Sequence, residues 1–144
     1  MVASVHVSRR QSREQLTART LAAIRNPHVD VIAHPAGRYI GSRDDLDLDW
    51  DSIYGEAART GTALELNGSD ERLDLSDVRA RRAAEFGCVF AIDSDAHRTE
   101  ELHNMRWGTA MARRAWLTPD RILNTRSRPD LLAWVGAKAG RLAT

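Results

Sequence analysis

Short apolar runs alternate with amphipathic stretches along the chain, and this alternation predicts parallel β-α-β units. Strands are expected at residues 2–6, 29–34, 63–67 and 89–92. Helices are expected at 12–25, 50–60 and 76–86, then across 99–115 with an interruption near Gly108, and from about residue 130. In the stretch 50–60, apolar residues fall at i, i+3, i+4, i+7 and i+8, and Gly61 follows where a helix cap belongs.

Two closures fit this order of elements, an open doubly wound sheet and a βα barrel. No G-x-G-x-x-G loop follows any of the expected strands, which counts against a dinucleotide-binding sheet. His6, His34, Glu65, Asn67 and the segment 93–97 all lie where a strand finishes. Strand ends meet on one face of a βα barrel, so these polar positions favour the barrel. The last helix should pack on this body through its apolar residues, which are Leu131, Leu132, Trp134 and Val135.

The composition limits the class of protein but does not indicate a substrate. At 144 residues with a formal net charge of +1, the chain suits one globular domain, and its charge gives no argument for nucleic-acid binding. Cys88 is the only cysteine and sits in an apolar run, so we expect a buried thiol and a reducing compartment. No signal peptide or membrane span is recognisable, and a soluble, cytoplasmic protein without membrane partners is expected.

The strongest chemical signal is the segment 93–97, in which Asp95 and His97 can supply an oxygen and an imidazole nitrogen to a metal. A polar turn that caps the next helix is the alternative interpretation. His34 ends its strand just before a proline, and His6 ends the first strand. Each could be a structural histidine, but recurrence of such groups at successive strand ends favours a metal site.

Three further residues are candidates for supporting roles. Glu65 and Asn67 point to the same side of their strand and could orient a ligating histidine from the second coordination shell; a structural hydrogen-bonding pair is equally possible. Arg38 follows the His34-Pro35 pair closely and could hold a substrate phosphate. An exposed loop arginine explains Arg38 equally well.

Several segments, in order, resemble the PHP (polymerase and histidinol phosphatase) domain, in the version found at the C-terminus of bacterial and archaeal family-X DNA polymerases. They cover nearly the whole chain, and they are residues 2–6, 26–38, 65–75, 93–97, 101–108 and 116–119. The resemblance implies an α/β fold that is the C-terminal part of a distorted (βα)7 PHP barrel, with residues 1–144 forming a partial PHP domain.

The same resemblance implies a metal-dependent phosphoesterase that performs 3′–5′ exonuclease or related 3′-end processing of DNA. It assigns His6, His34, Asp95 and His97 to the metals, with Asp95 and His97 as the catalytic pair. Up to three divalent ions, manganese or zinc, would activate a water to attack phosphorus, while Arg38 neutralises charge on the phosphate.

The family's first motifs, an N-terminal His-x-His, a further His and a bridging Glu, are absent from this sequence. We therefore expect a fragment whose missing N-terminal part belongs to the same polypeptide, with an exposed sheet edge and low activity by itself. Two alternatives stay open: a histidinol-phosphate-type phosphatase, and an inactive remnant with a structural or partner-binding role.

Overall fold

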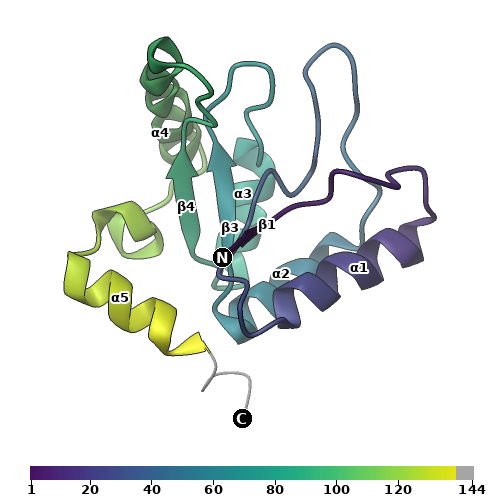
Figure 1. Cartoon of the computed structure of the whole chain (residues 1–144), viewed down its shortest axis with the longest axis horizontal. Coiled ribbons are helices and arrows are strands. Elements are labelled where there is room, and N and C mark those ends of the chain that lie inside the picture. The colour runs from purple at the N-terminus through teal and green to yellow at the C-terminus, as the bar shows by residue number, and fades with distance from the viewer. Residues whose placement is uncertain (139–144) are drawn as a thin grey trace.

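A four-stranded parallel sheet with strand order β1-β2-β3-β4 organises the computed structural model, which describes residues 1–138 (Figure 1). The strands are β1 Val2–Ala3, β2 Val31–Ile32, β3 Ala63–Asn67 and β4 Phe90–Asp93. The helices are α1 Arg13–Arg25, α2 Trp50–Thr60, α3 Asp77–Glu85, α4 Met105–Arg114 and α5 Arg128–Gly136. Short 3₁₀ turns η1 Thr99–Asn104, η2 Pro119–Arg121 and η3 Leu123–Thr125 complete the chain. The predicted α/β class with parallel strands is confirmed, whereas closure into a barrel stays a prediction.

The register of the sheet separates its two faces. Ile32 pairs with Leu64 and Leu64 with Phe90, and all three are buried in the main apolar core with side chains of α1, α2 and α3. Because side chains alternate along a strand, Glu65 and Asn67 lie on the opposite face. One face of the sheet therefore builds the core, and the other carries the polar candidates.

The helices end where the sequence predicted, but the first two strands are shorter than predicted. Ser12, Asp49 and Ser76 cap α1, α2 and α3. Gly61 ends α2 in the left-handed conformation, which confirms the cap predicted there. The first two expected strands are only two residues long, because the backbone leaves the ladder after Ala3 and Ile32.

The interruption expected near Gly108 is wrong. Helix α4 runs straight through this position, which is buried. A Cβ atom there would lie 2.6 Å from Ile92 Cγ2 and 3.1 Å from the Leu66 carbonyl oxygen. Gly108 is therefore a point of close approach between helix and sheet, not a helix break.

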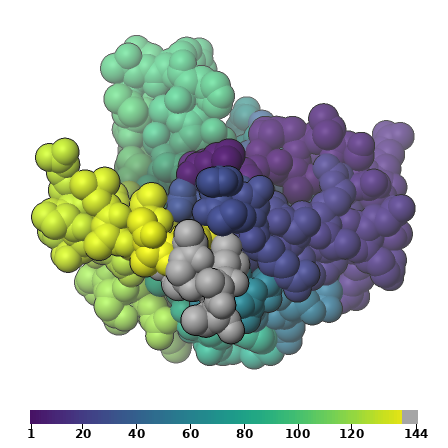
Figure 2. Space-filling view, turned by 60° about the horizontal axis from the view of Figure 1, so that its bottom comes forward, coloured from purple at the N-terminus to yellow at the C-terminus, as the bar shows by residue number. Residues whose placement is uncertain are grey.

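Helix α5 packs less completely than its apolar residues predicted. Leu132 is 59% exposed, and Leu131 and Val135 are also exposed. Together with Met1 and Val2, residues of α5 line an apolar cavity of about 320 Å³; Figure 2 shows this end of the molecule, with α5 in yellow. Edge strand β1 leaves Val2 61% exposed, which matches the expected exposed edge.

Among residues 1–138, no helix is long and apolar enough to cross a membrane.

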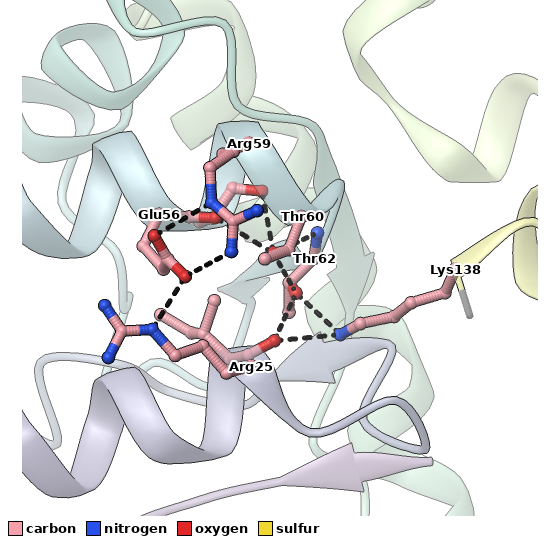
Figure 3. Close-up of polar contacts among 8 residues, drawn as sticks. Arg25, Glu56, Arg59, Thr60, Thr62 and Lys138 are labelled. Atoms are coloured by element: carbon pink, nitrogen blue, oxygen red, sulfur yellow. Dashed lines mark hydrogen bonds and ion pairs between the residues drawn. The ribbon is translucent and has the colours of Figure 1, made fainter. Parts of the chain in front are cut away.

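The buried side chain of Lys138, which follows α5, forms hydrogen bonds at the end of the sheet where β2 and β3 begin (Figure 3). Lys138 is 1% exposed and is the single lysine of the sequence. Its amine donates to the Ile24 carbonyl at 3.2 Å, to the Thr62 hydroxyl at 2.7 Å and to the Val29 carbonyl. The Ile24 carbonyl belongs to the last turn of α1, where a cation also interacts favourably with the helix dipole.

Replacing Lys138 by methionine should destabilise the fold by about 1–3 kcal/mol, because buried acceptors would lose their donor. The free energy of unfolding in urea measures this loss. Arg128→Met removes a positive charge from an exposed position of α5 and is the matched control. Equal stability of the two variants would show that the buried amine contributes nothing.

Candidate active site at the carboxyl ends of the strands

The candidate residues follow the carboxyl ends of the parallel strands. In Figure 1, strands β3 and β4 point towards the top of the picture. His34 lies two residues after β2 and Asp95 two residues after β4, while Asn67 is the last residue of β3. His6 follows β1 and meets His34 edge to face, with ring centroids 5.0 Å apart. Parallel strands therefore bring together side chains that lie far apart in the sequence.

His34 has the properties of a neutral imidazole that is ready to bind a metal. It is 8% exposed, and its Nδ1 atom is buried without a hydrogen-bond partner among the described residues. Burial, together with the charge of Arg72, lowers the pKa of His34 to about 4. The ring thus stays uncharged near neutral pH and keeps a free lone pair for a ligand.

Asp95 and His97 lie on the loop after β4. Asp95 has a left-handed backbone (φ 50°), and its N–H donates to Asp93 Oδ1 at 3.2 Å. Its carboxylate accepts from Arg72 Nε at 3.1 Å. His97 is exposed, and its Nδ1 lies 2.8 Å from the Asp95 carbonyl oxygen. Since a carbonyl can only accept, Nδ1 is the donor in this contact, which leaves Nε2 as the ring nitrogen that can bind a metal.

Glu65 connects these two loops from the centre of the sheet. It is 5% exposed; its Oε2 accepts from the backbone N–H of His34 and, at 3.1 Å, from the Asn67 amide. Its carboxyl group also hydrogen-bonds Asp93. Burial, the hydrogen bond and the Asp93 charge all raise the pKa of Glu65, so Glu65 holds the proton that the two carboxyl groups share.

Arg38 points its donors at the backbone. Its Nε donates to the Arg72 carbonyl at 2.6 Å, and its Nη2 donates to the Leu73 carbonyl. These bonds brace the segment after β3. A phosphate role for Arg38 stays a prediction.

Two polar residues that the sequence did not single out support the same site. Asp74 is fully buried and accepts from the N–H groups of Ala36 and Gly37, at 3.1 and 2.6 Å, which fixes the loop after His34. Arg72 is 8% exposed and lies between Asp95 and the hydroxyl of Tyr39. Both belong to the segment 65–75, in which only the resemblance drew attention to them.

The donor atoms fit a divalent metal ion but do not complete its coordination. His6 and His34 supply adjacent imidazoles, and Nδ1 of His34 has no hydrogen-bond partner among the described residues. Within residues 1–138, no three His, Cys, Asp or Glu side chains converge closely enough to hold an ion. Asp95 is held by Arg72, and His97 reaches into solvent.

Comparison with known proteins supports a phosphoesterase relationship. No model of a known protein family matches the sequence. The chain is 40% identical over 135 residues to the DNA polymerase/3′-5′ exonuclease PolX of Bacillus subtilis, covering 94% of this chain and 24% of that protein. It is 29% identical over 114 residues to a probable phosphatase of Syntrophotalea carbinolica, covering 75% of this chain and 45% of that protein. A probable phosphatase of Thermoanaerobacter sp. (strain X514) is also 29% identical, over 121 residues.

These similarities confirm the predicted resemblance to a family-X polymerase, and the probable phosphatases are consistent with a PHP-type domain. The chain spans about a quarter of the polymerase and less than half of each phosphatase.

The shared proton of Glu65 makes Glu65→Gln a conservative change. The amide keeps an acceptor for His34 and replaces the O–H donor to Asp93 by an N–H donor, so we expect a loss of stability below about 1 kcal/mol. Glu65→Ala should cost about 3 kcal/mol, because the buried partners lose their bonds. Urea unfolding separates the two results; a glutamine variant as unstable as the alanine variant would contradict a protonated Glu65.

The lowered pKa of His34 predicts how stability changes in acid. The unfolded state takes up the imidazole proton near pH 6.5, while the folded state resists protonation until about pH 4. The contribution of His34 is therefore fully present above pH 6.5 and is lost as the pH falls towards 4. Urea unfolding at several pH values should show a steeper decline for the wild type than for His34→Gln, which cannot take up the proton. Parallel curves would contradict the assignment.

Proposed function

We propose that this chain forms part of a metal-dependent phosphoesterase site that, within a longer polypeptide, processes the 3′ ends of DNA. One observation carries the proposal: the buried, unpartnered Nδ1 of His34 beside His6, at the carboxyl ends of parallel strands. Similarity to a polymerase named as a 3′-5′ exonuclease supports the choice of DNA. Divalent metals supply Lewis acidity and an activated water to such hydrolysis.

The proposed ligands are His6, His34, Asp95 and His97, and the chain's other residues set their states. Burial keeps the lone pair of His34 free, and the Asp95 carbonyl leaves Nε2 of His97 available. Glu65 and Asn67 act behind them by fixing the His34 backbone. Asp95 and His97 line a cavity of about 610 Å³, which is the proposed place of the substrate.

Since no three of these ligands converge within residues 1–138, we infer that the coordination is completed by groups outside the described residues. Manganese and zinc both suit the mixed nitrogen and oxygen donors. The similarity to probable phosphatases favours a second candidate, hydrolysis of a small phosphomonoester such as histidinol phosphate. An inactive remnant with a structural role is the third.

Mn²⁺ binding by the isolated chain should weaken at least about tenfold in His34→Ala, because a neutral buried imidazole is a direct ligand. Calorimetric titration with Mn²⁺ measures this. The matched control is His28→Ala, an exposed histidine in the loop before β2, which should bind like the wild type. Equal affinity of the wild type and His34→Ala would reject the metal role.

Hydrolysis by the isolated chain should be weak or absent for want of ligands, and it should depend on Mn²⁺ wherever it is measurable. A 3′-labelled DNA strand and a phosphomonoester, assayed side by side, distinguish the DNA substrate from the phosphatase alternative. Robust turnover of either substrate would show that the chain alone holds a complete site.

A further inference from the structure

We propose that Arg72 is a built-in counter-ion that competes with a divalent metal for Asp95 and thereby sets the metal affinity of the site. The inference rests on the proposed function, because it takes Asp95 as a metal ligand. It concerns a side chain that has no part in the hydrolytic chemistry described above.

The position of Arg72 carries the first part of the inference. Its guanidinium lies over the ring of Tyr39, 4.2 Å from the centroid, and Nη2 donates to the Tyr39 hydroxyl at 2.9 Å. Nε bonds the carboxylate of Asp95 at 3.1 Å. The charge of Arg72 also reaches His34, where it helps to lower the pKa. A cation fixed at this place opposes a second cation bound by the same two residues.

The contact between Arg72 and Asp95 is one that a metal ion can displace. Only Nε touches the carboxylate, whereas a forked pair would use two parallel bonds and would hold more strongly. Nη1 of Arg72 is buried and has no hydrogen-bond partner among the described residues. The side chain of Asp95 is 28% exposed and lines the cavity of about 610 Å³, so an ion can approach its free side.

Asp95 does not need Arg72 to keep its place. Its backbone N–H is held by Asp93, which is in turn hydrogen-bonded to the buried Glu65. Removing the guanidinium therefore frees the carboxylate, while the backbone of Asp95 stays anchored. If Arg72 were only a structural partner, its loss would lower stability and would bring no gain in metal affinity.

Calorimetric titration of the full chain with Mn²⁺ tests this. Arg72→Gln should bind Mn²⁺ at least about tenfold more tightly than the wild type, since an adjacent positive charge is lost. Arg98→Gln is the matched control: Arg98 lines the same cavity, pairs with Glu101 and has a side chain 77% exposed. It should change the affinity by less than about twofold, because exposed charges are screened. Unchanged or weaker binding by Arg72→Gln would overturn the inference.

A measurement on the unmutated chain guards against misfolding of the variant. With Zn²⁺ as a diamagnetic probe, the Nε–H resonance of Arg72 should shift as the metal binds, and its exchange with water should accelerate. A resonance that is unaffected at saturating Zn²⁺ would show that the Arg72–Asp95 contact survives metal binding, which overturns the inference.

Asp95→Asn separates this inference from the proposed function. If Asp95→Asn weakens Mn²⁺ binding while Arg72→Gln leaves it unchanged, the metal site stands and the counter-ion role falls. If Asp95→Asn and His34→Ala both bind Mn²⁺ like the wild type, the proposed site itself is wrong and the inference falls with it.

Discussion

The geometry of the site depends on one buried carboxyl group, that of Glu65. From the middle of β3 it holds the backbone of His34 on one side and the carboxyl group of Asp93 on the other. Asp93 in turn accepts from the N–H of Asp95. An isolated buried carboxylate is costly, and the shared proton removes that cost while it keeps every hydrogen bond. Two loops that carry candidate ligands are thus tied to a single rigid strand.

This arrangement explains how two residues keep unfavourable backbone conformations. His34 (φ 30°) and Asp95 (φ 50°) both lie in the left-handed region, which side chains rarely adopt. The backbone N–H of His34 donates to the buried Glu65, and that of Asp95 donates to the partly buried Asp93. Such strain persists only where the surroundings fix it, and it turns both side chains away from the path of a regular strand.

The sequence predicted the elements of this fold better than the contacts of the site. A helix cap such as Gly61 is a local signal, and it was predicted correctly because the few residues around it decide the outcome. Gly108 was misread because its role depends on how closely α4 approaches Ile92, which no local pattern reveals. Arg72 and Asp95 lie 23 positions apart in the sequence and form their ion pair because β3 pairs with β4. No local sequence pattern predicts such a contact.

Stability and chemistry occupy opposite ends of the sheet. Lys138 ties α5 to α1 and to the beginnings of β2 and β3, while the candidate ligands follow the ends of the strands. The amine of Lys138 donates hydrogen bonds to carbonyl and hydroxyl oxygens, which are good acceptors for a buried cation. The cation at the other end, Arg72, has only one bond to its carboxylate and an unpartnered nitrogen among the described residues. A cation that donates to several buried acceptors suits a permanent structural contact, whereas one that is incompletely bonded can release its carboxylate to a competing ion. The two ends of the same sheet thus use buried positive charge for different purposes.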